Sequence, residues 1–236
     1  MLTIKITPAN QGRKPSGWLG RFNLWRMNSS HSKLTGWGLR HISIDTHDTI
    51  LDVGCGGGRT VAKLADIAKQ GKVYGIDHSG ESVAASKKYV TQYITLGRVE
   101  ILQGSVSQLP FPNNMFDIVT AVETHFWWPN LSGDMQEVLR VLKPGGTLVF
   151  IAEIYKGANT TAAKFAEKYA SRPGMTLLRV DEHREHFTNA GYSNVQVTEE
   201  RGKAWICALG TKSTANPRSA ECGSMSSSGF TNFGSN

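Results

Sequence analysis

The stretch Ile50–Thr60, ILDVGCGGGRT, decides the fold of this chain. Its first residues are almost all apolar, which is typical of a buried strand, and the residues after the glycines favour a helix. Glycines at positions 54, 56 and 58 allow the backbone to bend sharply and a ligand to approach without meeting a Cβ atom. The stretch therefore predicts a strand, a turn and a helix, with a ligand bound at the turn.

The spacing of these glycines distinguishes the turn from the fingerprint of nicotinamide and flavin cofactors. That fingerprint, GxGxxG counted from Gly54, requires a glycine where this chain has Arg59. The chain instead reads GxGxG. Asp52 lies just before it, where a carboxylate can accept hydrogen bonds from an ammonium group or an ordered water. The spacing argues against a nicotinamide-dependent oxidoreductase.

Two further strands are expected to end beside the glycine turn. The run VYGID delivers Asp77 to the end of its strand, about 20 residues after Gly54, where an acidic residue commonly accepts hydrogen bonds from ribose hydroxyls. The alternative role of Asp77 is to cap the following helix. The next apolar run ends at Gly104 and Ser105. Because ligands in open α/β sheets bind outside the carboxyl ends of the strands, we expect these ends to line one crevice.

Short β-rich runs alternate with helical segments from Thr49 onward. This alternation predicts an α/β fold, a Rossmann-like three-layer sandwich with a mostly parallel sheet. The runs NVQVTEE and AWICALGTK are joined by a short turn, and strands joined so tightly must be antiparallel. An irregular stretch after Glu153, with a helix near residues 161–170, is a candidate insertion on the substrate side. The other expected helices lie near residues 59–69, 82–93, 132–142 and 180–190.

The chain is expected to divide into an N-terminal arm (1–44), a main domain (45–212) and a disordered tail (213–236) rich in Ser and Gly. The arm contains seven Lys or Arg and no Asp or Glu. It is therefore either a solvated basic arm or one that favours an anionic substrate or surface.

The arm also carries an aromatic stripe. Trp18, Phe22 and Trp25 fall on one face of a predicted helix, which must be buried against something. We expect the arm to fold over the crevice as a lid. On this hypothesis, removal of residues 1–40 abolishes activity while the remaining domain still folds.

The composition favours a cytoplasmic globular protein. The longest apolar runs, such as TLVFIA, are far shorter than the roughly 20 residues of a bilayer-spanning helix, so no stable membrane insertion is expected. Three widely spaced cysteines with no CxxC pair indicate neither a disulfide framework nor a metal site. The basic excess lies in the arm instead of forming a stripe across the folded domain, so no nucleic-acid partner is expected.

Four segments in order resemble the class I S-adenosylmethionine-dependent methyltransferases: LDVGCGGG, GIDHS, LPFPNNMFDIV and LRVLKPGGTLVF. They are most similar to the small-molecule branch related to quinone-biosynthesis methyltransferases, and the resemblance covers about residues 48–210. It implies a seven-stranded sheet with an antiparallel last strand. It also implies S-adenosyl-L-methionine as cofactor and a small-molecule methyl acceptor as partner.

The resemblance further implies which residues bind the cofactor. Those expected around its methionine part are Asp52, Gly54, Cys55 and Gly56. Those expected at its ribose and adenine are Asp77 and His78. The pocket is expected to be completed by Gly104, Ser105, Val106 and Val122. The chain departs from many relatives at Ser105, where they place an aspartate that binds the adenine amino group, and this departure leaves the adenine contact open.

A sulfonium methyl group is already activated, so transfer needs a general base only if the acceptor loses a proton. The candidate bases, near the ends of the fourth and fifth strands, are Glu123, His125, Glu153 and Tyr155. The segment His125–Asn130, HFWWPN, is expected to face the transfer site, where its rings line an acceptor pocket, lie over the sulfonium or pack against the arm. His183 and His186 are expected on a solvated helix face.

Two other functions remain open at this point. A noncatalytic regulatory protein would bind S-adenosylmethionine without releasing S-adenosylhomocysteine. A nucleic-acid or protein methyltransferase is the other alternative, although the chain shows neither an NPPY-type motif nor a separate basic recognition domain. The acceptor and a homodimeric assembly are not decided by the sequence.

Overall fold

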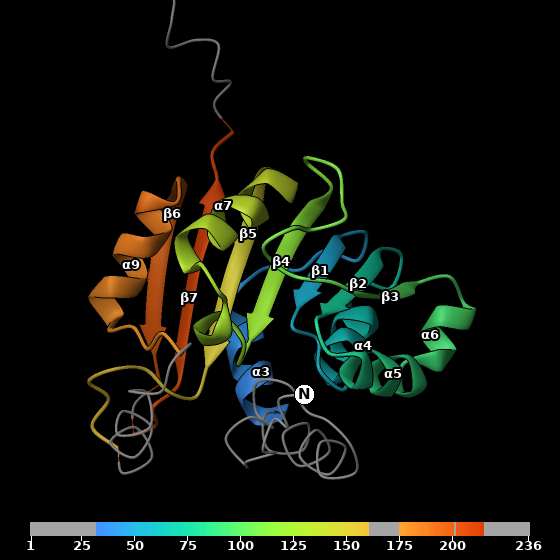
Figure 1. Ribbon diagram of the computed structural model, residues 1–236, viewed down its shortest axis with the longest axis horizontal. Coiled ribbons are helices and arrows are strands. Elements are labelled where there is room, and N and C mark those ends of the chain that lie inside the picture. The colour runs from blue at the N-terminus through green and yellow to red at the C-terminus, as the bar shows by residue number, and fades with distance from the viewer. Residues whose placement is uncertain (1–31, 161–174, 201, 215–236) are drawn as a thin grey trace, which may run out of the picture.

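The computed structural model describes residues 32–160, 175–200 and 202–214, and these form a sheet with helices on both faces (Figure 1). The strands are β1 (Thr49–Val53), β2 (Lys72–Asp77), β3 (Val99–Gln103), β4 (Phe116–Val122), β5 (Leu142–Ala152), β6 (Tyr192–Glu199) and β7 (Ile206–Lys212). The α-helices are α3 (Ser32–Gly38), α4 (Arg59–Ile67), α5 (Gly80–Tyr89), α6 (Thr91–Thr95), α7 (Leu131–Val141) and α9 (Val180–Asn189). Two short 3-10 helices are η1 (Leu39–His41) and η2 (His125–Trp127).

The sheet has seven strands in the order β3-β2-β1-β4-β5-β7-β6. The first five strands in this order pair in parallel, and β7 runs antiparallel to both of its neighbours. The predicted Rossmann-like sandwich and its antiparallel last strand are therefore confirmed. The order reverses at β1, where β2 lies on one side and β4 on the other, and a ligand crevice is expected at such a switch point.

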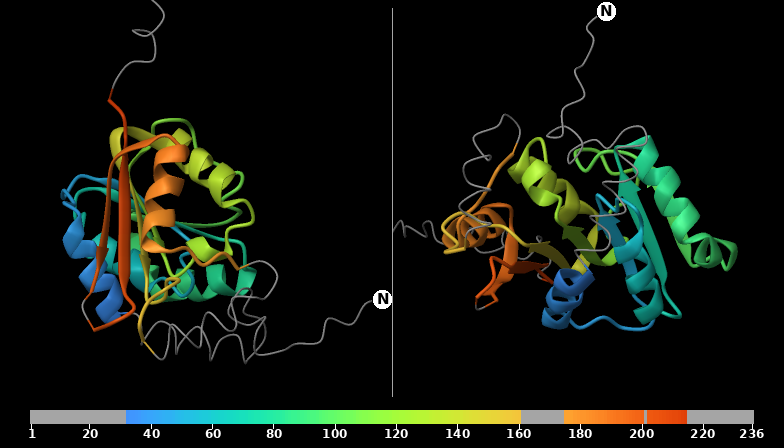
Figure 2. Two further views of the ribbon diagram at one scale, coloured as in Figure 1. Left: turned by 90° about the vertical axis from the view of Figure 1, so that its left-hand side faces the viewer. Right: turned by 90° about the horizontal axis from the view of Figure 1, so that it is seen from below.

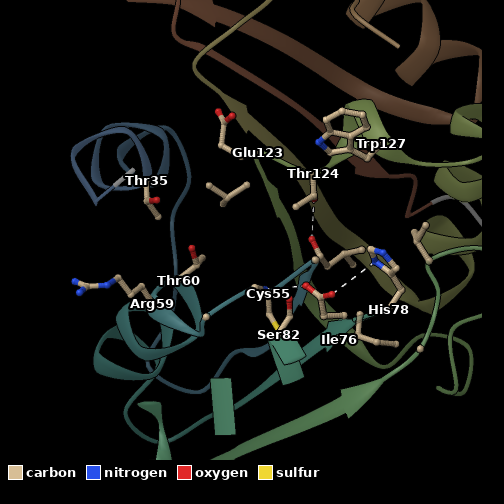
Figure 3. Close-up of a pocket in the computed structure, with 18 of the residues that line it drawn as sticks. Thr35, Cys55, Arg59, Thr60, Ile76, His78, Ser82, Glu123, Thr124 and Trp127 are labelled. Atoms are coloured by element: carbon tan, nitrogen blue, oxygen red, sulfur yellow. Dashed lines mark hydrogen bonds and ion pairs between the residues drawn. The ribbon is translucent and has the colours of Figure 1, made fainter. Parts of the chain in front are cut away.

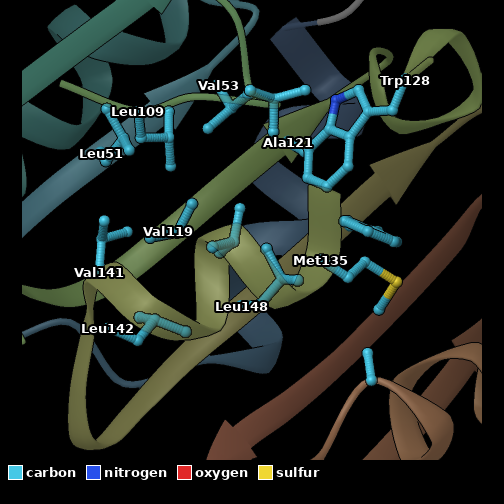
Figure 4. Close-up of a cluster of buried hydrophobic side chains, with 14 of the residues drawn as sticks. Leu51, Val53, Leu109, Val119, Ala121, Trp128, Met135, Val141, Leu142 and Leu148 are labelled. Atoms are coloured by element: carbon cyan, nitrogen blue, oxygen red, sulfur yellow. The ribbon is translucent and has the colours of Figure 1, made fainter. Parts of the chain in front are cut away.

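Two apolar cores lie on opposite faces of the sheet, and the view from below shows the layers (Figure 2). The helices α7 and α9 bury Met135 and Phe187 on one face (Figure 4). The helices α3, α4 and α5 cover the other face, where α4 buries Val61 and Leu64. Strands covered on both faces explain the nearly continuous apolar runs in the sequence.

The expected helix near residues 82–93 is two helices in the structure. Ser79 accepts a hydrogen bond from the backbone N–H of Ser82 and so caps α5, which begins earlier than expected. Val90, with a φ of −101°, ends α5, and α6 follows as a separate turn. The apolar period alone did not reveal this break.

Helix α3 corrects the boundary of the predicted arm. Leu34 and Trp37 on this helix are almost fully buried in the core that contains α4. A Cβ atom on Gly38 would lie only 2.5 Å from Ile151 Cδ1, so α3 packs closely on β5. Residues 32–41 therefore belong to the folded domain, and removal of residues 1–40 would remove part of its core.

Several expected features lie outside the described residues. They are the aromatic stripe of Trp18, Phe22 and Trp25, the helix near residues 161–170, and the tail beyond Thr214. Within the described parts of the chain, no helix has the length and apolar character that would let it cross a membrane.

Candidate functional site

A cavity of about 470 Å³ lies at the carboxyl ends of β1, β2, β3 and β4. Its walls come from the glycine turn, the end of β2, residues 104–106, residues 122–124 and 127–129, and from α3 and α4. Figure 3 shows Glu123 and Trp127 on one side of the cavity and Ile76 and His78 on another. The three strand ends that we expected to line one crevice are brought together here.

The glycine turn forms the floor between β1 and α4. The backbone N–H groups of Gly54 and Cys55 both donate to the carbonyl of Ile76, at 2.8 and 3.1 Å, which ties the turn to β2. Gly54 has a φ of +75°, and a Cβ atom there would lie 2.4 Å from Thr124 Cγ2. Gly56 also has a positive φ, +51°. The turn therefore needs glycine for its backbone angles and, at position 54, for close contact with the chain after β4.

Asp77 lies at the end of β2 with both carboxylate oxygens engaged. Oδ2 accepts a hydrogen bond from the backbone N–H of Gly56 at 3.0 Å, and Oδ1 accepts one from Ser79 at 2.9 Å. The His78 ring, half-exposed, lies 3.6 Å from Oδ1 through its Nδ1 atom. A carboxylate oxygen can accept more than one hydrogen bond, so Asp77 has acceptor capacity left for a ligand at the cavity wall.

The wall after β3 contains Gly104, Ser105 and Val106, and Val122 adds an apolar surface from the end of β4. The backbone N–H of Gly104 donates to the carbonyl of Asp77 at 3.0 Å, so this wall is attached to β2. The hydroxyl oxygen of Ser105 accepts a hydrogen bond from the backbone N–H of Ser107 at 3.2 Å. A serine hydroxyl can also donate, but it brings no negative charge to this wall.

Asp52 lies beneath the glycine turn instead of in the cavity wall. Its side chain is 2% exposed, and Oδ1 accepts a 2.7 Å hydrogen bond from the Thr120 hydroxyl. Burial raises the pKa of Asp52 to about 7; the Thr120 hydrogen bond acts in the opposite direction, and the charge of Asp77 adds to the rise. Asp52 is therefore a buried titratable group in β1, two residues before Gly54.

Of the four candidate bases, Glu123 lines the cavity. It follows β4 with a φ of +60°, which is uncommon for a residue with a side chain. Its Oε1 atom accepts a hydrogen bond from the backbone N–H of Glu153, so the side chain is held by the end of β5. Glu153 is not part of the cavity wall, and Tyr155 is buried against Glu199, to which it donates a hydrogen bond.

His125 is placed away from the cavity, contrary to the expectation that it faces the transfer site. Its ring is 2% exposed and stacks on Phe150 with a centroid distance of 4.4 Å. Burial, and then the neighbouring His183, hold the pKa of His125 well below its usual value. This geometry places His125 in the packing layer behind the site.

His183 was expected on a solvated helix face, but the structure buries it. The side chain is 1% exposed, and its ring centroid lies 5.5 Å from that of His125. Nδ1 lies 2.6 Å from the carbonyl of Arg179. The polar neighbours of His183 in the sequence concealed that it lies on the buried face of α9, together with Phe187.

The aromatic segment divides between the cavity and the core. Trp127, Trp128 and Pro129 line the cavity. Phe126 packs instead into a third apolar cluster with Tyr155 and Ile206. Residues 127–129 therefore line the cavity, and Phe126 anchors the segment in the core.

Sequence reasoning missed one wall of the cavity. Arg59, Ala62, Lys63 and Asp66 follow one face of α4, and they face the cavity together with Thr35 of α3. Each of these four residues has another of them three or four positions away, and this spacing could have shown that they share one face of the helix. Thr35 had no such signal, because only the packing of α3 brings it here.

Comparisons with known proteins show which proteins this chain is similar to. Residues 51–150, which contain the glycine turn, Asp77 and Glu123, match the family model described as a methyltransferase domain. Over these residues the chain is similar to methyltransferase domains. It is 30% identical over 162 residues to sterol 24-C-methyltransferase ERG6 of Saccharomyces cerevisiae, which covers 66% of this chain and 42% of that protein. The chain thus spans less than half the length of this methyltransferase relative.

Another relative is similar over most of its own length. The demethylmenaquinone methyltransferase of Oceanobacillus iheyensis is 28% identical over 199 residues, which covers 75% of this chain and 82% of the relative. Among solved structures, a methyltransferase from Haloferax volcanii in complex with the activator Trm112 has a TM-score of 0.72 at 22% identity, over 83% of this chain and 96% of that chain. A SAM-dependent methyltransferase from Aquifex aeolicus has a TM-score of 0.65 at 22% identity, over 80% and 96%. These structures share the fold.

Proposed function

We propose that this chain transfers a methyl group from S-adenosylmethionine to a small-molecule acceptor. The observation that carries the proposal is the hydrogen bond between the Asp77 carboxylate and the backbone of Gly56 at the edge of the cavity. It places an acceptor for ribose hydroxyls beside a turn whose positive φ angles and lack of side chains leave room for the rest of the cofactor.

The described residues fit this cofactor. Asp77 would accept hydrogen bonds from the ribose hydroxyls, and the Gly54–Gly56 turn would contact the methionine part. His78, Ser105 and Val106 would surround the adenine, with Ser105 in place of the aspartate found in many relatives. Asp52 beneath the turn would supply negative charge to the cationic part of the cofactor.

When bound, the cofactor supplies a methyl group already activated by a sulfonium. The residues of the chain then have to hold the acceptor in line and exclude water, and good orientation can lower the barrier by about 7 to 11 kcal/mol. Trp127, Trp128 and Val122 would form the apolar walls that do this. Glu123 is the candidate base that lies in the cavity, where it would take a proton from the acceptor.

The relatives favour a small-molecule acceptor. Their names state a sterol and a demethylmenaquinone as the groups of molecules on which they act. The mixture of aromatic, apolar and carboxylate side chains around the cavity suits such an acceptor. A cytoplasmic location stays a prediction from the sequence, and a homodimer stays one possible assembly.

Two measurements on the purified chain test the proposal. Calorimetry with S-adenosylmethionine and S-adenosylhomocysteine should detect binding of both. Release of S-adenosylhomocysteine should then be followed with demethylmenaquinone, a sterol and a metabolite extract as acceptors. Turnover in the Glu123→Gln variant should fall by about 10² to 10⁴ without loss of cofactor affinity if Glu123 is the base. Failure to bind either compound would overturn the proposal, and binding without turnover on any acceptor would favour the regulatory alternative.

A further inference from the structure

Exposed apolar side chains gather on one part of the surface. Within the described residues, four large apolar side chains are at least 36% exposed, and all belong to the region from α4 to α6. They are Ile67 (36%), Tyr89 (49%), Ile94 (36%) and Leu96 (68%). Single exposed apolar residues are normal on a protein surface, but their concentration in one region marks a contact surface.

The helices that bear these residues are tied together. The hydroxyl of Tyr93 on α6 donates to Asp66 of α4 at 2.6 Å. Arg98, after α6, donates to the carbonyls of Ala65 and Ala68 on either side of Ile67. The end of α4 and the turn that contains Leu96 therefore lie side by side. We call the exposed side of residues 66–69 and 87–97 the α4–α6 face.

This face is also basic. Residues 66–69 and 87–97 contain three Lys and one acidic residue, Asp66. Lys69, Lys87 and Lys88 are exposed on the α4–α6 face, and none forms an ion pair with another described residue. The acidic residue, Asp66, is hydrogen-bonded to Tyr93.

We propose that the α4–α6 face docks on the surface of a bilayer that contains anionic lipids. Exposed apolar side chains beside unpaired lysines fit such a surface, because the apolar groups enter the interface while the ammonium groups attract lipid phosphates. A protein partner of ordinary composition offers less charge complementarity to lysines that form no ion pair within residues 32–160, 175–200 and 202–214.

The α4–α6 face adjoins the cavity. Tyr89 is part of the α4–α6 face and also lines the cavity, as does Asp66. Docking would therefore place one side of the cavity opening at the lipid surface. If the proposed methyl transfer is correct, an acceptor dissolved in the bilayer can enter without crossing water.

Vesicle co-sedimentation with the full chain tests the docking without any measurement of activity. The vesicles are phosphatidylcholine alone or with about 30% phosphatidylglycerol, at about 0.15 M salt. We expect partitioning onto the anionic vesicles only. Neutralisation of Lys87 and Lys88 to Gln should weaken it about 10- to 30-fold, and Leu96→Ser should weaken it about tenfold.

A matched control is needed, because residues 1–31 contain five Lys or Arg that also attract anionic lipid. Lys156→Gln with Lys203→Gln removes the same charge from exposed positions elsewhere and should leave partitioning within about twofold of the full chain. Equal weakening by both pairs would overturn the proposal, since attraction would then follow net charge alone. The proposal would also be overturned if Leu96→Ser bound the anionic vesicles as strongly as the full chain.

A further readout separates the bilayer from a second copy of the chain. Sedimentation velocity in the absence of lipid should show the same species for the full chain and for Leu96→Ser. An oligomer that this substitution disrupts would overturn the bilayer proposal and assign the face to self-association. Cofactor affinity should be equal in all variants, so loss of docking is distinguishable from failure of the proposed function.

Discussion

The carboxylate of Asp77 and the backbone N–H of Gly56 are joined by a 3.0 Å hydrogen bond across the candidate cofactor site. This bond connects two motifs that lie on adjacent parallel strands, β1 and β2. It holds the carboxylate in place before a ligand arrives, so little conformational freedom is lost on binding.

Asp77→Asn should weaken cofactor binding by about 10- to 100-fold, because the amide replaces one charged acceptor by a donor. Calorimetry with S-adenosylhomocysteine measures this change. Asp181→Asn, an acidic residue on α9 far along the chain from the site motifs, is the control and should bind normally. Unchanged affinity in Asp77→Asn would refute the ribose assignment.

Gly54→Ala should destabilise the fold by about 2 to 4 kcal/mol, from the left-handed backbone and from the contact with Thr124. Gly97→Ala is the matched control. Its φ is +71° but nothing lies within 4 Å of the added Cβ atom, so it should cost only about 1 kcal/mol. Adding Thr124→Ser to Gly54→Ala removes the clashing methyl group and should recover part of the loss. Urea unfolding measures all four proteins, and equal losses for the two alanine variants would show that the contact is unimportant.

Asp52→Asn should raise the free energy of unfolding above pH 7. It should also lower the affinity for the cofactor. The folded-state pKa of about 7 lies above the value of an unfolded aspartate, so ionisation of Asp52 removes stability as the pH rises toward and through 7. Asparagine never ionises and avoids this loss. The lost negative charge should weaken binding of cationic S-adenosylmethionine more than binding of S-adenosylhomocysteine, which lacks the sulfonium. Equal weakening of the two ligands in calorimetry would contradict an electrostatic role.

Acid should destabilise the fold through His125 and His183. Burial lowers the pKa of both rings in the folded state, whereas an unfolded histidine titrates near pH 6.5. Below about pH 6.5 the unfolded chain binds protons that the folded chain excludes, so the free energy of unfolding falls by up to about 1.4 kcal/mol per pH unit for each ring. His125→Phe should reduce this slope between pH 6.5 and 5, measured by urea unfolding. An unchanged slope in His125→Phe would contradict this origin of the acid sensitivity.

Removal of residues 1–31 should leave a folded chain that binds cofactor but transfers no methyl group, if the arm is a lid. Removal of residues 1–41 should instead prevent folding, because it deletes Leu34, Trp37 and Leu39 from the core. Each buried side chain of this size contributes about 1.5 to 3 kcal/mol, and three together approach the total stability of many domains. Thermal unfolding separates the two truncations. Full activity without residues 1–31 would rule out the lid.

The motifs around the cofactor site were recognisable in the sequence because each is local. A strand, a glycine turn and a helix follow one another within Ile50–Thr60, and the acidic end of β2 lies at the spacing typical of nucleoside sites. The alternation of strands and helices likewise predicted the layers and the antiparallel hairpin of β6 and β7.

The residues that were misplaced depend on packing between distant segments. His125 and His183 are 58 positions apart in the sequence and meet only because α9 places His183 beside η2. His125 was expected at the transfer site and His183 on a solvated helix face, but both rings are buried, and His125 stacks on Phe150. Thr35 reaches the cavity because Leu34 and Trp37 bury α3 in the core.

By itself the sequence therefore determined the class of fold, the glycine turn and the carboxylate beside it, because backbone geometry and strand order follow from local residue types. Only the tertiary structure decided which candidate base lies in the cavity, that Asp52 is buried beneath the turn, and which helix surfaces are left exposed. These properties depend on how apolar faces far apart in the chain exclude water together, and no local pattern contains that information.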